Sequence, residues 1–448
     1  MKKNERYEMT VDDISSEGFG IGRAGGMAVF TEGALPGDVI ETLIVGVKIN
    51  YCYGKLLKII TPSPFRVEPK CALSGKCGGC SLQSFAYEAQ LAHKKSVVEN
   101  ALKRIGGLGG FETGGVIGMD NPYFYRNKAQ FPASVINGAP ALGFYSKRSH
   151  RLVAVDECAA VHPVNTAVIN TVNAFLREYG VSVYNETSRT GVMRHVIVRT
   201  AFATGEIMVC AVINGDRLPH SDEFARELAK IGGMTSVCAN INKNLGNVIL
   251  GKKTITLWGK DHITDYIGNV KFQISPASFF QINSVQARVL YETSLAFADP
   301  SPDSVAADVY CGIGAFSLFF APKVKKVIGL ESVSQAVRDA EINAAANGIK
   351  NVRFVEGLAE QTLQNVAREE KPDIVILDPP RKGCEAGLLK TITDAGPEKI
   401  IYASCDPATL ARDLRFLTQN SYILKKAHPV DMFPQTNHVE TVCLLVKA

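Results

Sequence analysis

The sequence lacks the features of a membrane or secreted protein. It contains no run of about 18 apolar residues, the length that a membrane-spanning helix requires. The first residues, Met1 to Arg6, lead into no apolar segment, so no secretory signal is expected. Internal repeats and low-complexity segments are also absent. We therefore expect a cytoplasmic protein with no membrane partner, and its 448 residues are enough for two or three globular domains.

A large excess of charge of one sign is also missing. The formal net charge is +5, from 49 Lys and Arg residues against 44 Asp and Glu residues. This mild charge permits a polyanionic partner but does not require one. Nor is a disulfide framework expected for the 11 cysteines of an intracellular chain. Six of them lie in apolar or turn contexts and are expected to be packing residues: Cys52, Cys210, Cys238, Cys311, Cys384 and Cys443.

What the C-terminal third does contain is a cysteine at a position typical of catalysis. Residues 399–403 form an apolar run bounded by Pro397 and Pro407, which predicts a short buried strand. Residues 409–417 then have helical spacing. Cys405 therefore lies where a strand leaves a sheet, which is where open α/β folds place their chemistry. Taken by itself, this thiol is either a small buried hydrophobe or a nucleophile.

The segments upstream of this cysteine have the pattern of a nucleotide-binding sheet. Residues 305–309 predict a strand that runs into Gly312 and Gly314 and then into a helix. The next strand ends in Glu331, whose carboxylate is placed to accept from ribose hydroxyls. The third glycine of the dinucleotide motif is missing. The shortened form, together with Asp378-Pro379-Pro380 after a further strand, fits S-adenosylmethionine better than a dinucleotide.

A second group of cysteines has the spacing of ligands. Cys71, Cys77 and Cys80 lie close together, and Gly78-Gly79 between the last two lets backbone amides face inward. Zinc and a [4Fe–4S] cluster each require a fourth donor, for which Cys158 is the best candidate. The spacing of the triplet leaves both metals possible.

The order of short β runs, helices and turns predicts a multidomain α/β protein. Residues 1–62 are expected to form a small OB-like β-barrel, residues 63–270 an α+β central domain, and residues 271–448 a Rossmann-like domain with a mostly parallel sheet. An amphipathic helix is predicted from Leu82 to Ile105 and another helix from Ala277 to Phe297.

Together these motifs are similar to those of the S-adenosylmethionine-dependent RNA uracil-C5 methyltransferases, which make 5-methyluridine in transfer and ribosomal RNA. The resemblance extends over nearly the whole chain, and Ala315, where a threonine is common, is a small departure. The N-terminal residues resemble the TRAM module, an RNA-binding barrel. The matching segments are Phe279 to Asn283, Asp308 to Gly314, Asp378 to Gly383, Ser404 to Pro407 and His438 to Glu440 for the methyltransferase, and Glu17 to Gly22 and Ala34 to Asp38 for TRAM.

The resemblance implies a role for each matching residue. Cys405 would be the nucleophile that adds to C6 of uracil, and Glu440 the general base that removes the C5 proton. Asp378 would contact the cofactor, the uracil edge, or both. The residues implied to bind S-adenosylmethionine are Gln281, Tyr310, Glu331, Asp378, Asp308, Gly312 and Gly314.

The resemblance also implies a metal centre and an RNA partner. The distant fourth cysteine matches the iron–sulfur subset of the family, so Cys71, Cys77, Cys80 and Cys158 are expected to hold a structural [4Fe–4S] cluster. That subset favours 23S ribosomal RNA as the substrate, with transfer RNA as the alternative. We expect a monomer. The residues expected to contact RNA are Phe279, Phe280, Arg126 and Lys128.

Two other classes of function share parts of this pattern. An amino-methyltransferase would also use an Asp-Pro-Pro loop, but it requires an aromatic residue after the prolines, where this chain has Arg381, and it needs no cysteine. A non-catalytic RNA-binding or iron–sulfur assembly protein would have no use for both Cys405 and Glu440. We therefore predict the uracil-C5 methyltransferase activity.

Overall fold

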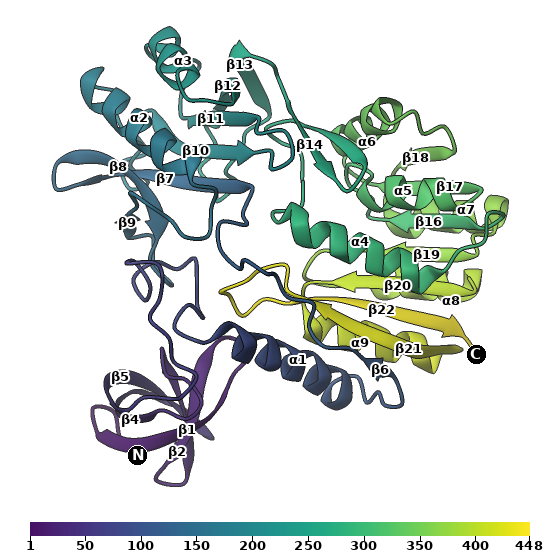
Figure 1. Ribbon diagram of the computed structural model, residues 1–448, viewed down its shortest axis with the longest axis horizontal. Coiled ribbons are helices and arrows are strands. Elements are labelled where there is room, and N and C mark those ends of the chain that lie inside the picture. Colours follow the sequence, from purple (N-terminus) through teal and green to yellow (C-terminus); the bar gives the residue numbers. More distant parts are fainter.

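Five short strands at the N-terminus close into a barrel, as predicted for residues 1–62. The computed structural model describes all residues 1–448, and the barrel lies at one end of the molecule (Figure 1). The buried Asp38 accepts backbone hydrogen bonds from Leu35 (2.7 Å) and Ser63 (2.8 Å) and pairs with Arg66, which fixes the barrel to the segment that follows it. The strands are β1 (Arg6–Ile14), β2 (Phe19–Ala24), β3 (Met27–Glu32), β4 (Val39–Val47) and β5 (Tyr51–Thr61), in the order β1-β2-β3-β5-β4.

A seven-stranded sheet with two helices forms the central part of the chain. Its strands are β7 (Lys128–Ile136), β8 (Ala139–Tyr145), β9 (Leu152–Ala154), β10 (Met193–Thr200), β11 (Ile207–Ile213), β12 (Met234–Ile241) and β13 (Lys253–Gly259), and its helices are α2 (Val164–Glu178) and α3 (Ser221–Ala229). The order is β13-β12-β11-β10-β7-β8-β9. All pairs are antiparallel except β11 and β12, because α3 provides the crossover that parallel neighbours need.

An eight-stranded sheet carries the predicted catalytic motifs. Its strands are β6 (Glu112–Thr113), β16 (Val305–Val309), β17 (Lys326–Glu331), β18 (Val352–Glu356), β19 (Ile374–Leu377), β20 (Lys399–Ser404), β21 (Tyr422–Val430) and β22 (Glu440–Lys447). The order is β18-β17-β16-β19-β20-β22-β21-β6, and the first five strands are parallel. The order reverses between β16 and β19, and ligands of open α/β sheets bind beyond the carboxyl ends of strands at such a point.

Helices cover both faces of this sheet, which explains why its strands are continuous apolar runs. In β19, Ile374 and Ile376 point into one core while Val375 and Leu377 point into the other. The first core also contains α4 (Ser284–Ala298), α5 (Ala315–Phe320) and α6 (Ser334–Ala346), and the second contains α1 (Tyr87–Arg104), α7 (Ala359–Glu370), α8 (Ala386–Ala395) and α9 (Pro407–Gln419). None of the helices combines the length and the apolar content needed to cross a bilayer.

The structure places α1 and β6 apart from the central sheet, although they precede it in sequence. Helix α1 packs on α9 of the catalytic sheet, and β6 pairs with β21 at the edge of that sheet (Figure 1). A ribbon of β14 (Ile263–Ile267) and β15 (Val270–Ile274) packs against α4 and α6. The chain therefore enters the C-terminal unit, leaves it to build the central sheet, and returns. The proposed division at residues 62 and 270 stays a prediction.

The helix predicted from Ala277 begins only at Ser284. Asn283 caps it by accepting a hydrogen bond from the Gln286 amide at 3.2 Å. Before the cap, the Ser275 and Ser278 hydroxyls bond to each other at 2.8 Å, and such local bonds of serine compete with helix formation. The segment that contains Phe279, Phe280 and Gln281 is therefore a loop rather than the first turn of a helix.

Candidate active site

Strand pairing brings the two predicted catalytic residues to one place. Ser404 at the end of β20 lies opposite Thr441 in the antiparallel β22. Cys405 follows Ser404 and Glu440 precedes Thr441, so Cys405 and Glu440 are neighbours at the same edge of the sheet. Glu440 is buried, and its charge acts on the thiol of Cys405. A thiol and a carboxyl group separated by 35 residues in sequence thus become one site.

The surroundings of Cys405 both oppose and favour its thiolate. Burial, together with the charges of Glu440 and Asp378, raises the pKa of Cys405 to about 11, and the guanidinium of Arg381 acts in the opposite direction. Helix α9 begins directly after the cysteine, where Asp406 caps the amides of residues 408 and 409 at 3.0 and 2.9 Å. A helix N-terminus favours an adjacent thiolate. In the free protein, Cys405 is therefore a protonated thiol at neutral pH that is placed near the Arg381 cation and the N-terminus of α9.

Three carboxyl groups, the buried Asp308 and Glu440 and the half-buried Asp378, lie near one another at the carboxyl ends of β16, β19 and β20. Burial, and then the neighbouring Asp308, raises the pKa of Asp378 to about 7. Burial and the charge of Asp378 raise the pKa of Glu440 well above its usual range, while Arg381 lowers it. The phenol of Tyr291, on α4, lies among the same three carboxyl groups. Glu440 is therefore able to hold a proton near neutral pH, as a general base must after it has acted.

The loop after β16 is shaped for a ligand. Tyr310 has a φ of 69°, which is uncommon for a residue other than glycine, and Gly312 and Gly314 have φ of 54° and 84°. A Cβ on Gly314 would come within 2.9 Å of the Phe354 ring, so this position has no room for a side chain. This strained turn leaves its backbone accessible to a ligand beside the end of β17.

Two carboxylates next to this loop fit a nucleoside ligand. Asp308 accepts from the amide (2.9 Å) and hydroxyl (2.6 Å) of Ser317 through one oxygen, while its other oxygen is buried without a partner. Glu331 accepts from the amide of Gly312 at 3.1 Å through one of its oxygens. A buried acceptor without a partner is costly unless a ligand supplies a donor. Asp308 therefore has an acceptor available to a ligand, whereas the second oxygen of Glu331 accepts from the amide of Val333 at 2.8 Å, and the cofactor contacts of both residues stay a prediction.

In the loop before α4, the two aromatic residues predicted to contact RNA lie in different surroundings. The side-chain amide of Gln281 hydrogen-bonds to the phenol of Tyr291. The backbone carbonyl of Gln281 accepts from the side chain of Asn127 at 2.8 Å. Phe279 is 70% exposed, whereas Phe280 is 6% exposed and packs on Phe272 with ring centres 5.6 Å apart. Because Phe280 belongs to the core, the prediction that it contacts RNA is wrong, and only Phe279 is available to stack on a base.

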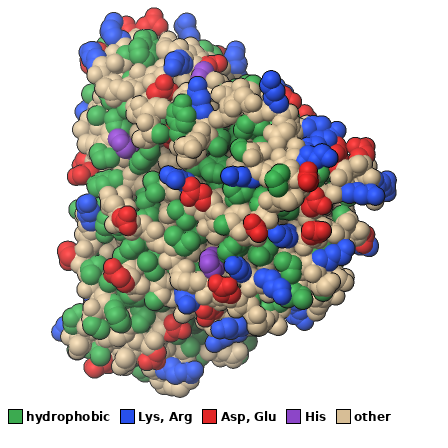
Figure 2. Space-filling view, turned by 45° about the vertical axis from the view of Figure 1, so that its right-hand side comes forward, with side chains coloured by type: hydrophobic (Ala, Val, Ile, Leu, Met, Phe, Trp, Pro, Cys, Tyr) green, Lys and Arg blue, Asp and Glu red, His purple; other side chains and the backbone are tan.

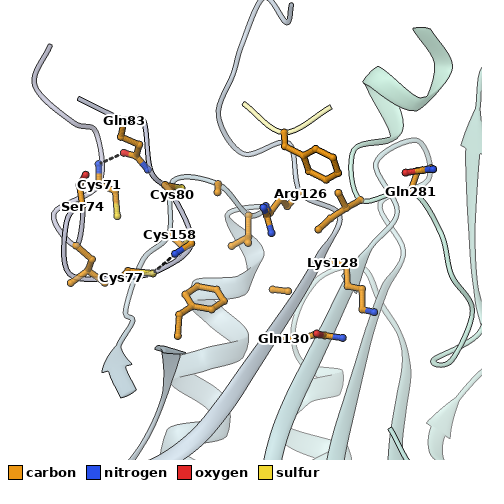
Figure 3. A pocket seen from close by; sticks show the side chains of 18 of the residues that line it. Cys71, Ser74, Cys77, Cys80, Gln83, Arg126, Lys128, Gln130, Cys158 and Gln281 are labelled. Atoms are coloured by element: carbon orange, nitrogen blue, oxygen red, sulfur yellow. Dashed lines mark hydrogen bonds between the residues drawn. The ribbon is translucent and has the colours of Figure 1, made fainter. Parts of the chain in front are cut away.

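The four cysteines of the predicted cluster line one cavity of about 470 Å³. They lie at one end of it, with Arg126 between them and Lys128 (Figure 3). Burial raises the pKa of Cys77, of Cys80 (to about 11) and of Cys158. Hydrogen bonds to sulfur act in the opposite direction: the Gly79 amide donates to Cys77 at 3.3 Å, the Gln83 side chain to Cys80, and the amides of residues 160 and 161 to Cys158. However, no three or more His, Cys, Asp or Glu side chains are arranged to hold a metal ion. The four cysteines thus share one cavity, their role as ligands stays a prediction, and the iron–sulfur cluster is not confirmed.

The two basic residues predicted to contact RNA lie in this cavity. Arg126 is near Cys80 and Cys158, and its cation favours the thiolates of both. Lys128 lies opposite Arg199 in the antiparallel pair of β7 and β10, and burial together with Arg199 lowers the pKa of Lys128 to about 8. Arg126 therefore faces the cysteines, and its contact with RNA stays a prediction, as does that of Lys128.

A polar cleft of about 310 Å³ lies between the barrel and the active-site loops. Arg148, at the tip of the hairpin between β8 and β9, stacks on Phe19 of the barrel at 4.9 Å, and Lys147 pairs with Glu32 at 2.7 Å. His438 lines the cleft and contacts Arg381 at 3.4 Å, so the cleft leads toward Cys405. On the face seen in Figure 2, basic side chains are mixed with acidic ones and form no continuous basic surface.

Comparison with known proteins identifies the family. A model of the tRNA (uracil-5-)-methyltransferase family matches residues 252–448, and a model of the TRAM domain matches residues 2–57. An RNA methyltransferase of Clostridium tetani is 45% identical over 99% of this chain and 97% of its own length. The chain belongs to the RNA uracil-5 methyltransferase family. An RNA methyltransferase of Halalkalibacterium halodurans is similar to it as well, with 43% identity over 99% of this chain and 98% of that protein.

A solved structure shares the architecture of this RNA uracil-5 methyltransferase. It is the Pyrococcus abyssi tRNA (uracil-54, C5)-methyltransferase in complex with S-adenosyl-L-homocysteine. The TM-score is 0.80 and the sequence identity 26%, over 98% of this chain and all of that one. The barrel, the central sheet and the catalytic sheet are therefore common to the two proteins.

Sequence reasoning missed two residues of the methyltransferase site. Tyr291 is a fully buried aromatic residue on α4, and its spacing in the sequence is that of an ordinary core residue. Arg381 was noted only as part of a motif, although it is the one cation that favours the thiolate of Cys405. Its place after Asp378-Pro379-Pro380, next to a predicted nucleophile, was the available signal.

We predict that Arg381→Gln makes Cys405 harder to ionise. Loss of the cation raises the pKa of Cys405, and each unit lowers the thiolate fraction about tenfold at a fixed pH. Cys405 is alkylated with iodoacetamide at pH values from roughly 7 to 11, and mass spectrometry of the Cys405 peptide gives the extent of alkylation at each pH. The plot of alkylation against pH should be displaced to higher pH in the variant. Lys382→Gln is the matched control, since Lys382 pairs with Glu385 at 2.7 Å and should leave the profile unchanged. An unchanged profile for Arg381→Gln would contradict the assignment.

Proposed function

We propose that this methyltransferase transfers a methyl group from S-adenosylmethionine to C5 of a uridine in RNA through a covalent bond between Cys405 and C6. The observation that carries the proposal is the pairing of β20 with β22, which sets the thiol of Cys405 beside the carboxyl group of Glu440. A nucleophile and a base at one point are what methylation at C5 requires. The loop after β16 and Glu331 support the choice of donor.

The reaction follows from the weak nucleophilicity of C5. The Cys405 thiolate adds to C6, and the electrons of the C5–C6 double bond move to C5 and the O4 enolate. Bound S-adenosylmethionine supplies an electrophilic methyl group, which C5 takes. Glu440 then removes the C5 proton, the double bond forms again, and the bond between C6 and sulfur breaks to return the thiolate. The methyl donor leaves as S-adenosyl-L-homocysteine. Cys405 returns as a thiolate and Glu440 as a carboxylic acid, so the enzyme is restored once Glu440 passes its proton to the Cys405 thiolate or to solvent.

The pKa values suit this order of events. The raised pKa of Cys405 means that its thiol must lose a proton before it attacks, and Arg381 stabilises the resulting thiolate. The raised pKa of Glu440 lets it retain the proton it takes from C5 at neutral pH. Burial and Asp308 raise the pKa of Asp378 to about 7, and the charge of Asp378 in turn helps to raise the pKa of Glu440.

The target base must leave its stack to reach the thiol, because C6 is enclosed in a paired helix. The exposed Phe279 is placed to stack on a flipped base. The polar cleft between the barrel and the loop with His438 would receive the neighbouring nucleotides, with Arg148 and Lys147 near their phosphates. All of these groups belong to one chain, which supports action as a monomer.

The proposed substrate is 23S ribosomal RNA, on the resemblance to the iron–sulfur subset of the family. Transfer RNA is the second candidate, favoured by the whole-chain likeness to the Pyrococcus abyssi tRNA (uracil-54, C5)-methyltransferase. Mapping 5-methyluridine in total RNA from a strain that lacks the gene decides between them. We predict the loss of 5-methyluridine from 23S ribosomal RNA. Its loss from transfer RNA alone would contradict this choice and support the second candidate.

We further propose a [4Fe–4S] cluster at Cys71, Cys77, Cys80 and Cys158. The shared cavity, the amide donors to sulfur and the nearby Arg126 support it, since hydrogen bonds to cluster sulfurs are typical of such sites. None of the steps above passes through the cluster, so its role is structural.

Protein purified without oxygen should therefore contain about four irons per chain. Cys158→Ser should lose most of this iron, because it removes the ligand that joins the 71–80 segment to the central domain. Cys52→Ala, in the core of the barrel, is the matched control and should keep it. Iron and acid-labile sulfide are measured by chemical analysis. Stoichiometric zinc in place of iron would contradict the cluster.

Substitution of the base separates the two halves of the reaction. In Glu440→Gln, Cys405 should still attack and the methyl group should still move, but removal of the C5 proton should slow by about 10²-fold or more. A protein–RNA adduct that carries the labelled methyl group should accumulate and survive denaturing gels, and Cys405→Ala/Glu440→Gln should show none. Normal turnover of Glu440→Gln would make Glu440 a structural acid. Inactivity without an adduct would place its role before methyl transfer.

A further inference from the structure

The loop from Asp431 to Val439 leads directly into the proposed base. It connects β21 to β22, and Val430 at the end of β21 pairs with Glu440 at the start of β22. Both ends of the loop therefore lie beside the carboxyl group of Glu440. Whatever fixes the path of this loop also fixes the place where β22 begins.

A buried ion pair holds the start of the loop. Lys94 of α1 donates to Asp431 at 2.5 Å, and both side chains are fully buried. Lys94 also donates to the carbonyl of Phe433 at 3.1 Å, and the hydroxyl of Tyr87 donates to the second oxygen of Asp431 at 2.7 Å. A buried ion pair contributes little net stability, because desolvation offsets the attraction, but it requires one geometry.

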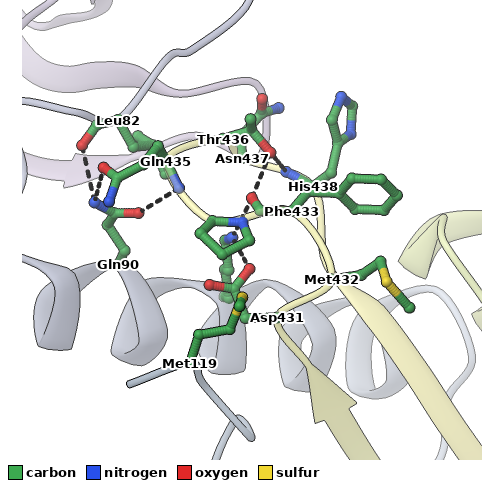
Figure 4. Close-up of polar contacts among 12 residues, drawn as sticks. Leu82, Gln90, Met119, Asp431, Met432, Phe433, Gln435, Thr436, Asn437 and His438 are labelled. Atoms are coloured by element: carbon green, nitrogen blue, oxygen red, sulfur yellow. Dashed lines mark hydrogen bonds and ion pairs between the residues drawn. The ribbon is translucent and has the colours of Figure 1, made fainter. Parts of the chain in front are cut away.

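A second side chain of α1 holds the middle of the loop. Gln90 donates to the side chain of Gln435 at 3.0 Å and accepts from its backbone amide at 3.1 Å, as Figure 4 shows. Gln435 has a φ of 66°, a left-handed conformation that a residue other than glycine adopts only when its surroundings impose it. The amides of Ser81 and Leu82 also bond to the carbonyl of Gln435, each at 3.0 Å. The loop is thus held in a strained form by groups outside the catalytic sheet.

These contacts come from a part of the chain that the methyltransferase model does not match. Helix α1 lies before residue 252, where that match begins, yet it packs on the catalytic sheet. Its apolar contacts with the sheet come from Val98, Ala101 and Leu102. Lys94 and Gln90 instead contact the loop through the ion pair and hydrogen bonds described above.

We propose that Lys94 and Gln90 are positioning residues for Glu440, which act on proton removal rather than on methyl transfer. The inference rests on the proposed function. Attack by Cys405 depends on β20 and the start of α9, and the donor is held by loops after β16 and β17, none of which these two side chains contact. Glu440 depends on the loop they hold. Their loss should therefore slow the return of the thiolate and leave the earlier steps nearly intact.

The test measures the covalent protein–RNA adduct formed with methyl-labelled S-adenosylmethionine and an RNA that the wild-type protein methylates. Lys94→Met keeps the length of the side chain and removes its charge and hydrogen bonds. Gln90→Ala removes the neutral contacts and does not leave a carboxylate buried without a partner. Both variants should transfer one methyl group at nearly the wild-type rate, release product about tenfold more slowly, and accumulate labelled adduct. Lys103→Met, at an exposed position of the same helix paired with Glu99, should behave like the wild type.

Further variants separate positioning from stability. In Lys94→Met/Asp431→Met both buried charges are gone, so the folded state should be about as stable as the wild type, whereas the adduct should still accumulate. An adduct that disappears in this double variant would overturn the proposal. Gln90→Ala would also overturn the proposal if it turned over at the wild-type rate, or if it lost both half-reactions equally and formed no adduct. Glu440→Gln is the reference: if it also forms no adduct, the proposed chemistry fails, and the inference with it.

Discussion

The active site depends on one antiparallel strand pairing at the edge of a parallel sheet. β22 lies beside β20 in the opposite direction, so the start of one strand and the end of the other meet. In an all-parallel arrangement, Glu440, the first residue of β22, would lie at the opposite edge of the sheet. Because the strand is reversed, Glu440 reaches the same edge as Cys405 and Asp378. The register matters as much as the direction, since a shift by one residue would turn every side chain of β22 to the other face.

The site that this pairing creates has an unfavourable charge balance without its ligands. Asp308 and Glu440 are buried close to the half-buried Asp378, and Arg381 is the cation that acts on Glu440. The result is raised pKa values for the carboxyl groups and for Cys405. The sulfonium of the proposed donor would bring a positive charge to this group. Binding of the donor would thus stabilise the ionised carboxylates and prepare the site electrostatically for reaction.

The sequence predicted the parts of the molecule that depend on local patterns. Gly312 and Gly314 mark the turn after β16, Cys405 follows an apolar strand, and the N-terminal β runs form a barrel. It did not predict features that depend on distant contacts. Nothing in the sequence distinguishes Lys94 from its exposed neighbour Lys95, because burial of Lys94 depends on Asp431, more than 300 residues away.

Two further differences have similar causes. The helix predicted from Ala277 begins at Ser284, because the hydrogen bond between the Ser275 and Ser278 hydroxyls and the Asn283 cap outweigh the helical spacing of the apolar residues. Phe279 and Phe280 are equivalent in the sequence, and only the packing of Phe280 on Phe272 decides which of them is exposed.

The central claim is that Cys405 bonds to C6 of the target uridine, and RNA that contains 5-fluorouridine tests it most directly. Fluorine at C5 cannot be removed as a proton, so the reaction should stop after methyl transfer with the nucleotide still attached to the protein. The account predicts a stable complex in which mass spectrometry finds methylated 5-fluorouridine on the peptide that contains Cys405. A modified nucleotide on another cysteine, or methylation without any covalent complex, would contradict it.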